Sequence, residues 1–333
     1  MISVAQYHRI YNMGQKTKKT EIERLKDQFL EYLEIERGRS PKTIENYGRY
    51  LDFFLNWAHI KDPREITDEL TRNFRIHLNR LEDRNGRKLK KVTQGYYAIA
   101  LRSFLKYLAK RDIKTLQAEK VEIGKSPERE VEFLEEDEVE RLLSAANGSD
   151  FKSLRDRAIL EMLFSAGLRV SELISIDRDK LNLKSGELSV RGKGDKIRVV
   201  FISDTAKEAL KSYLDKRIDI DPALFVRDAK AQEKFESKDK ENKKDNDNLR
   251  LTPRSIQRIV KYYAVKAGIV KNVHPHTLRH SFATDLLING ADIRSVQAML
   301  GHSSITTTQV YTHITNQQLR EVHKAFHARR RKK

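Results

Sequence analysis

Apolar side chains in the first third of the chain recur every three or four residues, the spacing that places them on one face of a helix. Ser40-Pro41 supplies an N-cap followed by a proline at the first helical position, and Thr67 supplies another cap. Asp62-Pro63 and Asn85-Gly86 interrupt the pattern. We therefore predict four helices between Glu21 and about Arg111. Their apolar stripes are Leu25, Phe29, Tyr32 and Leu33; Tyr47, Leu51, Phe54 and Leu55; Phe74, Leu78 and Leu81; and Tyr96, Ile99, Ala100, Phe104, Tyr107 and Leu108.

After residue 131 the pattern becomes mixed. Two short segments, 188–191 and 197–201, predict strands, and Gly192-Lys193-Gly194-Asp195 between them predicts a hairpin turn. Helices are predicted at 135–146, 151–165, 203–217, 252–267, 276–289, 292–300 and 315–326. The fold class expected from these elements is mainly α with a small β-sheet.

Breaks in the pattern predict two domains, the number that 333 residues favour. Segment 227–249 is rich in Lys, Glu, Asp and Asn and cannot bury a core of its own, so we predict a disordered insertion there. The expected organisation is an N-terminal extension (1–19), a four-helix domain (20–112), an exposed linker (113–131), a second domain that contains the insertion (132–327) and a basic tail (328–333).

Composition narrows the class of partner. The chain has 66 basic and 48 acidic side chains, a net charge of +18. Residues 1–130 hold 28 basic and 19 acidic side chains and residues 131–333 hold 38 and 29, so each part carries +9. This even split suggests two bodies that both face phosphate, although a lysine-rich surface would give the same total. Cysteine is absent, which excludes disulfides and cysteine-bound metal. No membrane-spanning or signal segment is found, so we expect a soluble, cytoplasmic protein without a membrane partner.

Arg169 is the first candidate functional residue. It interrupts a long apolar segment beside Gly167, and a buried guanidinium needs a carboxylate or a bound anion. Glu172, three residues on, is close enough on a helix to be that partner. Taken alone, this stretch favours a structural ion pair.

Lys193 is the second candidate. Glycines on both sides of it allow the backbone to approach another molecule closely, and lysine is a compact proton donor. A solvated turn lysine is the commoner situation for such a residue.

The third candidate stretch runs from His274 to Ala283. Pro275 predicts that a helix begins at about His276, where free backbone N–H groups favour an anion, and His276 and Arg279 can address the same phosphate. His276 and His280 have the i, i+4 spacing of a zinc pair, but a cationic arginine lies between them and no Glu follows His276. His280 is expected to support the site without acting directly.

The fourth candidate stretch runs from Leu300-Gly301-His302 to Tyr311. Tyr311 is one of twelve tyrosines, so ordinary packing is its default interpretation. It follows a threonine-rich, weakly helical segment, a context that predicts mobility of the tyrosine rather than burial.

Together these stretches resemble the tyrosine recombinase (phage integrase) family, and most closely its Xer-type members. The family signature is Arg, Lys, His-x-x-Arg, His/Trp and Tyr in this order, and the resemblance covers about residues 20–327. The insertion and the N-terminal extension depart from the pattern. The matching positions are Arg169, Lys193, His276, Arg279, His302 and Tyr311, within Gly-Leu-Arg-x-Ser-Glu-Leu, Gly-Lys-Gly-Asp-Lys, His-x-Leu-Arg-His-Ser-Phe-Ala-Thr, Leu-Gly-His-Ser and Thr-Thr-x-x-Tyr-Thr-His.

The resemblance implies an N-terminal SAM-like core-binding domain, an α+β catalytic domain, and DNA cleavage through a 3′-phosphotyrosyl link. In this hypothesis Arg169 and Arg279 bind the non-bridging oxygens of the scissile phosphate, and Tyr311 attacks phosphorus. His302 donates a further hydrogen bond and Lys193 protonates the leaving 5′-oxygen. His276 is the base toward Tyr311, and Glu172 holds the cluster in place.

The partner implied is double-stranded DNA, bound by a homotetramer that joins two DNA sites. The helix at 315–326 is a candidate for docking onto a neighbouring subunit, with self-packing as the alternative. No metal or other cofactor is expected. Basic side chains on or beside the second and fourth helices are either solvated or in contact with phosphate: Lys42, Arg49, Lys90, Lys91 and Arg102.

Three other functions remain open from the sequence. A type IB topoisomerase-like enzyme would nick and religate a single duplex, and a non-catalytic DNA-binding protein of the same fold would have no need of Tyr311 or Lys193. A metallohydrolase based on the histidines fits least well. Whether a recombinase would resolve chromosome dimers or integrate or invert DNA is not encoded in these motifs.

Overall fold

The computed structural model describes residues 19–83, 86–124, 132–192, 196–228, 249–302, 304–305, 308 and 311. The chain divides into two compact units, Met1–Glu128 and Arg129–Lys333. Several predicted features lie outside the described residues. They are Lys193, the N-terminal extension up to residue 18, most of the insertion (229–248), the helix at 315–326 and the basic tail.

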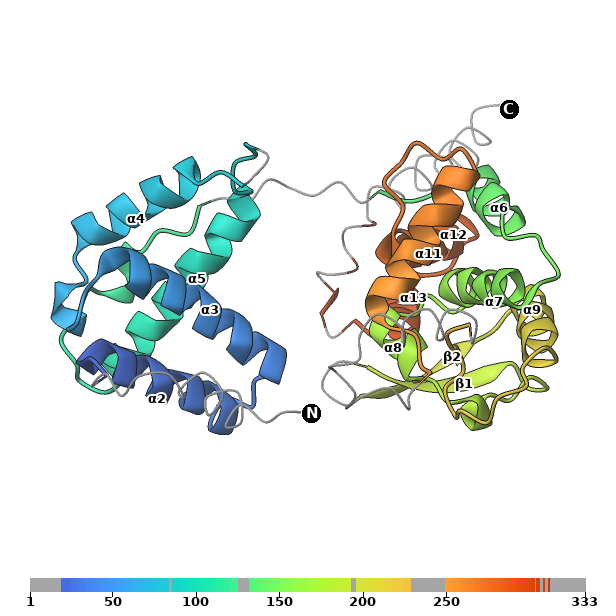
Figure 1. The fold of residues 1–333 in the computed structure, drawn as a ribbon, viewed down its shortest axis with the longest axis horizontal. Helices are drawn as coiled ribbons and strands as arrows, with labels where there is room; N and C mark the ends of the chain where they lie inside the picture. The colour runs from blue at the N-terminus through green and yellow to red at the C-terminus, as the bar shows by residue number, and fades with distance from the viewer. Residues whose placement is uncertain are drawn as a thin grey trace, which may run out of the picture. The chain divides into compact units, whose positions relative to one another are not determined.

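The first unit contains the four predicted helices (Figure 1). They enclose a core of aliphatic and aromatic side chains. Thr20, Ser40 and Thr67 cap three of them by accepting a backbone N–H, as small hydroxyl side chains do at helix starts. The elements are α2 (Glu21–Ile35), α3 (Pro41–Ala58), the 3-10 turn η1 (Pro63–Glu65), α4 (Asp68–Arg80), α5 (Lys91–Lys110) and η2 (Ala118–Lys120).

One detail of this unit differs from the expectation. Tyr96 and Ile99 were placed in the apolar stripe of the fourth helix, but they are 46% and 38% exposed. Phe104 and Leu108, one and two turns further on, are fully buried. The first half of α5 therefore exposes an apolar face, because the buried stripe shifts around the helix toward Ala98 and Leu101.

The second unit is built around a helix, α7, that is buried nearly all round: Ala158, Ile159 and Leu160 are fully enclosed. This helix packs against other helices of the unit, some of which carry candidate functional residues as well as core residues. The helices are α6 (Glu136–Ser144), α7 (Phe151–Ser165), α8 (Val170–Ser175), the 3-10 turn η3 (Arg178–Lys180), α9 (Asp204–Leu214), α11 (Pro253–Lys266), α12 (Pro275–Ile288) and α13 (Ile293–Leu300).

A two-stranded antiparallel sheet, β1 (Glu187–Arg191) and β2 (Ile197–Phe201), completes the second unit (Figure 1). Leu188, Val190 and Val200 turn toward the core, and the alternate positions of both strands turn outward, as the period of two requires. The prediction of a mainly helical chain with one small sheet is confirmed. In the part of the chain that the structure describes, no helix is long and apolar enough to cross a membrane.

Candidate active site

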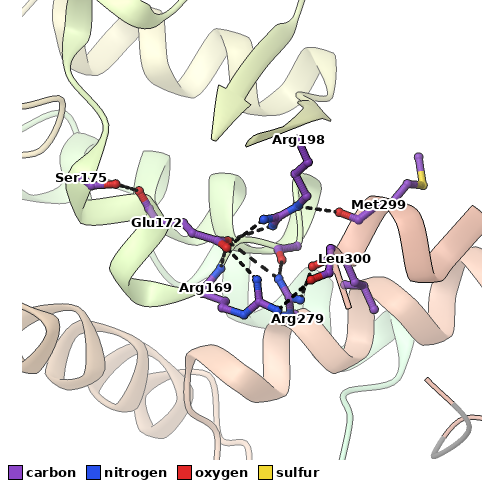
Figure 2. Close-up of polar contacts among 9 residues, drawn as sticks. Arg169, Glu172, Ser175, Arg198, Arg279, Met299 and Leu300 are labelled. Carbon is purple, nitrogen blue, oxygen red and sulfur yellow. Dashed lines mark hydrogen bonds and ion pairs between the residues drawn. The ribbon is translucent and has the colours of Figure 1, made fainter. Parts of the chain in front are cut away.

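Three arginines from three different elements meet around one carboxylate (Figure 2). Arg169 lies at the start of α8, Arg198 in β2 and Arg279 in α12. The carboxylate belongs to Glu172, the third residue of α8, which is 2% exposed. The structure therefore brings together Arg169 and Arg279, which are 110 positions apart in the chain, as the sequence hypothesis requires.

Glu172 is held by hydrogen bonds on both of its oxygens. Oε1 accepts from Arg169 Nη1 at 2.7 Å and Arg198 Nη1 at 2.8 Å, and Oε2 accepts from the Arg169 backbone N–H and Arg198 Nη2, both at 2.8 Å. Burial alone would raise the pKa of this carboxyl, but the bonds from Arg198 and Arg169 outweigh it and lower the pKa to about 2. Glu172 is therefore ionised at any physiological pH and neutralises part of the arginine charge.

Gly167 explains why a glycine precedes Arg169. Its φ is +55°, and a Cβ there would lie 2.4 Å from the ring of Phe282 on α12. Both observations demand glycine. The Gly167 carbonyl accepts a hydrogen bond from Arg279 Nη1 at 2.6 Å, so the glycine lets α12 approach closely enough to join the two arginines.

Arg279 is 4% exposed and is held by backbone carbonyls on two sides. Nη2 donates to Leu300 O at 2.5 Å, in addition to the Nη1 bond to Gly167. Burial, with the nearby charge of Arg169, lowers the pKa of Arg279 to about 9, so the guanidinium stays charged at neutral pH. A buried cation with an incompletely neutralised charge is a strong anion site.

His276 lies at the second position of α12, which begins at Pro275 as predicted to within one residue. His274 caps the helix, and its Nδ1 accepts the Thr277 backbone N–H at 3.1 Å. The His276 ring is exposed, and partial desolvation, followed by the charges of His274 and Arg279, lowers its pKa. A neutral imidazole at the surface of the arginine site can accept a proton.

His302 follows the end of α13 directly. Its Nδ1 lies 3.0 Å from the hydroxyl of Thr308, a buried residue that the sequence reasoning did not single out. Burial lowers the pKa of His302 to about 4, and the charges of Arg279 and Arg169 act in the same direction. When the Thr308 hydroxyl donates to Nδ1, the ring proton is on Nε2 and can be donated to an anion.

Tyr311 is buried, contrary to the expectation of a mobile side chain. The residue is 1% exposed and packs with Ala283, Leu287 and Leu300 between α12 and α13. Its hydroxyl lies 2.5 Å from His280 Nδ1. Threonine-rich composition misled the prediction, because composition does not show that α12 and α13 leave an apolar space between them.

Burial sets the acidity of this phenol. Desolvation raises the pKa of Tyr311 to about 12, and the nearby Arg279 charge opposes that rise. Burial likewise lowers the pKa of His280 to about 4, so the imidazole is neutral. In this arrangement Tyr311 is a protonated phenol that contacts His280, and the charge of Arg279 affects its pKa.

Lys193 lies outside the described residues, but both sides of its turn are described. Gly192 N–H donates to Lys196 O at 2.8 Å. A Cβ on Gly192 would lie 3.4 Å from Glu172 Oε1. The end of β1 that leads into Lys193 is thus adjacent to the carboxylate at the centre of the arginine cluster.

The predicted DNA-contacting residues all lie on or next to two helices that pack together, α3 and α5. Lys42 pairs with Glu45 at 2.7 Å, and the Arg49 guanidinium lies 5.2 Å above the Tyr50 ring. Lys90 caps α5, Lys91 begins it, and Arg102 follows three turns later. Tyr50 also packs 6.3 Å from the exposed ring of Tyr96, so aromatic rings lie among the basic residues.

A metal site does not emerge from these side chains. Among the described residues, no group of three His, Cys, Asp or Glu is placed to hold a metal ion. The zinc interpretation of the histidines therefore finds no support, since His280 contacts Tyr311 and His276 lies beside cations.

Arg198 is the main residue that sequence reasoning missed. The signal was present: in β2, Arg198 shares the inward face with Val200 and pairs across the sheet with Val190. A cation at an inward strand position requires a buried partner. Thr308 carried no such signal, because any of several threonines could have met His302.

Comparison with known proteins gives matches over most of the chain. Residues 132–318 match the profile of the phage integrase family, and residues 27–112 match that of the phage integrase N-terminal SAM-like domain. The tyrosine recombinase XerD of Listeria innocua is 38% identical over 305 residues, which cover 91% of this chain and 98% of that protein. The tyrosine recombinase XerC of Thermodesulfovibrio yellowstonii is 35% identical over 309 residues, covering 90% and 94%.

Solved structures share the fold. The XerH site-specific recombinase bound to a palindromic difH substrate, in a post-cleavage complex, superimposes with a TM-score of 0.67 at 22% identity and covers 90% of this chain and 84% of that one. A lambda integrase (75–356) dimer bound to a COC′ core site gives 0.64 at 18% identity, with coverage of 87% and 94%.

Proposed function

The chain belongs to the phage integrase family, and from this premise we propose that it is a site-specific DNA recombinase of the tyrosine type, which cleaves and rejoins DNA through a 3′-phosphotyrosyl intermediate. The predicted fold class, a SAM-like helical domain followed by a tyrosine recombinase catalytic domain, is confirmed. The observation that carries the proposal is the meeting of Arg169 and Arg279 around Glu172, with the Tyr311 hydroxyl 2.5 Å from Nδ1 of His280, the residue that follows Arg279.

The arginine pair binds the scissile phosphate. A phosphodiester resists nucleophiles because of its negative charge, so cleavage without a metal requires cations placed in advance. Arg169 and Arg279 are both anchored by carbonyls and by Glu172, and three guanidinium groups share one carboxylate. The surplus charge supports their assignment to the two non-bridging oxygens. His302 adds a neutral hydrogen-bond donor next to them.

Tyr311 is the nucleophile and is stored in an unreactive form. To attack phosphorus its hydroxyl leaves His280 Nδ1 and turns to the phosphate beside Arg279, with His276 accepting the phenolic proton. Cleavage therefore requires that the hydrogen bond between Tyr311 and His280 breaks and that the Tyr311 ring leaves its buried position. This change links cleavage to DNA binding. The new bond joins the tyrosine oxygen to phosphorus, and the bond from phosphorus to the 5′-oxygen breaks.

Lys193 supplies a proton to the departing 5′-oxygen. The position of Gly192 beside Glu172 supports this role, because Gly192 directly precedes Lys193 in the chain. The phosphotyrosyl link conserves the energy of the phosphodiester, so the 5′-hydroxyl of a second strand can reverse it. Tyrosine nucleophiles act in this family without a metal cofactor or ATP.

Double-stranded DNA is the partner. Residues 20–112 form the helical DNA-binding domain, and residues 132–327 form the catalytic domain. The segment between them is not wholly the exposed linker predicted at 113–131, because Ala118 and Val121 are buried in the core of the helical domain. The basic residues on α3 and α5 contact phosphates, and the half-buried Tyr50 and the exposed Tyr96 lie among them. Strand exchange takes place in a tetramer on two DNA sites, with the helix at 315–326 docking on a neighbour.

The biological role is either resolution of chromosome dimers, as the resemblance to Xer proteins suggests, or integration of a mobile element. Both roles act on DNA in the cytoplasm.

The test uses Tyr311→Phe and a nicked suicide substrate that traps the covalent link. Wild-type protein should form an adduct that persists in EDTA, and Tyr311→Phe should bind the same DNA and form none. An adduct with the variant, or one that requires Mg²⁺, would contradict the proposal. Two-site plasmids should yield recombinant products; relaxation alone would instead indicate a topoisomerase-like enzyme.

A further inference from the structure

Arg198 occupies a strand position where an apolar side chain is expected. It lies opposite Val190 in the sheet and on the same face as Val200, and its side chain is only 11% exposed. Burying a guanidinium at such a position is costly unless every donor finds a partner. A guanidinium at this position therefore requires hydrogen-bond partners that compensate for its burial.

Each of its three guanidinium nitrogens has a partner (Figure 2). Nη1 and Nη2 donate to the two oxygens of Glu172 at 2.8 Å each, the side-by-side geometry that arginine forms best with a carboxylate. Nε donates to Met299 O at 2.9 Å. Gly301 makes room for this side chain, since a Cβ there would lie 2.8 Å from Arg198 Cδ.

Because Arg198 bonds both oxygens of Glu172, it limits how the other two arginines contact that carboxylate. With Arg198 on both oxygens, Arg169 reaches the carboxylate through Nη1 and its backbone N–H. Arg279 Nη1 lies 3.9 Å from Oε2, an ion pair beyond hydrogen-bond distance. Glu172 thus bonds one guanidinium nitrogen of Arg169 and leaves Arg279 beyond hydrogen-bond distance, so part of the charge of both residues remains available to an anion.

The end of α13 forms a second anchor for the same three residues. Successive carbonyls accept from them: Met299 O from Arg198 at 2.9 Å, Leu300 O from Arg279 at 2.5 Å and Gly301 O from Arg169 at 3.3 Å. The carboxyl end of a helix carries partial negative charge and suits cations. Arg198 therefore joins the sheet, Glu172 and the end of α13 immediately before His302.

We propose that Arg198 is a positioning residue for DNA cleavage: it occupies Glu172 and holds the end of α13, so that Arg169 and Arg279 present their charge to the scissile phosphate instead of to the carboxylate. This inference rests on the proposed function. Without Arg198, the Glu172 carboxylate pairs more closely with Arg169 and Arg279, and these two arginines then bind the scissile phosphate less strongly.

The test measures single-turnover cleavage of the suicide substrate at saturating DNA. Arg198→Met should slow cleavage on the order of 100-fold, the cost of misplacing catalytic groups by about 1 Å. Arg198→Lys should be intermediate, because one ammonium cannot bond both carboxylate oxygens and a carbonyl. Arg155→Met is the matched control: the Arg155 side chain is 7% exposed against 11% for Arg198, and its bonds go to Asp156 and Val226 O rather than to Glu172.

The decisive measurement is a double-mutant cycle with Glu172→Gln. If Arg198 acts by occupying Glu172, a neutral amide should no longer capture Arg169 and Arg279, and Arg198→Met/Glu172→Gln should cleave about fivefold faster or more than Arg198→Met alone. The same cycle with Arg198→Lys applies if the methionine variant does not fold, as judged by thermal unfolding.

Two results would overturn the inference. One is cleavage at the wild-type rate by both Arg198 variants, or losses no larger than that of Arg155→Met at equal loss of stability. The other is a double variant as slow as, or slower than, the single Arg198 variant, which would show a scaffold role independent of Glu172. A wild-type protein that forms no adduct at Tyr311 would instead refute the proposed function, so the two failures are distinguishable.

Discussion

The two domains treat positive charge in opposite ways. In the catalytic domain, Arg198 and Arg279 are buried and share the carboxylate of Glu172 with Arg169. In the helical domain, Lys42 is 71% exposed in an i, i+3 pair with Glu45 on the surface of α3. The arginines of the Glu172 cluster are held in fixed positions at a cost in folding energy, whereas Lys42 lies on the surface of the helical domain.

This difference suits the buried cations to catalysis and the exposed cations to DNA affinity. Exposed ion pairs contribute about 0–1 kcal/mol and are screened by salt, so an exposed cation such as Lys42 can exchange its partner for a phosphate at little cost. Buried cations cannot rearrange so easily, and their fixed orientation suits a single phosphate in a transition state. We therefore expect substitutions in the two regions to change different measurements.

The largest effect is expected for Arg279→Lys. An ammonium cannot reach both Gly167 O and Leu300 O while also facing phosphate, so cleavage should fall about 10²- to 10³-fold. Single-turnover cleavage at saturating DNA measures this loss, and DNA affinity should change little. Equal losses in affinity and in cleavage would remove the distinction between the two regions.

The second effect is a loss of stability in acid that originates in the catalytic domain. In the folded chain the pKa values of His280 and His302 are about 4, against an ordinary 6.5, because burial disfavours the charged rings. Unfolded chains therefore bind more protons between these values, and the free energy of unfolding should decrease as pH falls from about 6.5 to about 4. Each ring should contribute about 1–2 kcal/mol after allowance for partial exposure.

Denaturant unfolding of the full chain between pH 7 and pH 4 measures this dependence, and His302→Gln should flatten it. Glu172 adds a later loss, from about pH 4.5 to about pH 2, because its carboxylate form is stabilised in the folded state. A pH profile that His302→Gln leaves unaltered would locate the acid-sensitive groups elsewhere.

A smaller effect is expected for Arg49→Ala or Arg102→Ala on the helical domain. Each should weaken DNA binding about 3- to 10-fold at low salt and reduce the slope of log affinity against log salt concentration by about one. Glu45→Ala is a useful counterpart, since it releases Lys42 and should tighten binding slightly. An unchanged salt slope would show that these arginines do not contact phosphate.

The smallest effect is expected from replacing residues 229–248 with a short Gly-Ser linker. The two ends of this segment already meet, since Arg227 N–H donates to Leu249 O at 2.8 Å and Val226 pairs with Arg250. Cleavage should stay within about twofold, and the free energy of unfolding should rise by about 1 kcal/mol from the shorter loop. A large loss of cleavage would assign the insertion a role in the reaction.

Helices and strands were predictable because their signals are local. Caps such as Ser40-Pro41 and Thr67, and the apolar spacing behind them, depend only on residues within a few positions. The predicted starts and ends of α7, β2 and α13 agree with the structure to within one residue. The errors arose where a third element decides exposure, as for Tyr96 on α5 and Tyr311 between α12 and α13.

The sequence by itself determined the order of the motifs, the candidate reactive side chains and the family to which they belong, because the motifs and their spacing can be identified without knowledge of packing. Only the tertiary structure decided that Glu172 serves three guanidinium groups, that Arg198 is one of them, and that the Tyr311 phenol rests on His280. Apart from the pair of Arg169 with Glu172, those contacts join residues that are at least 26 positions apart in the chain. Contacts between residues so far apart in the chain depend on how the helices and the sheet pack, and a local sequence pattern does not predict that packing.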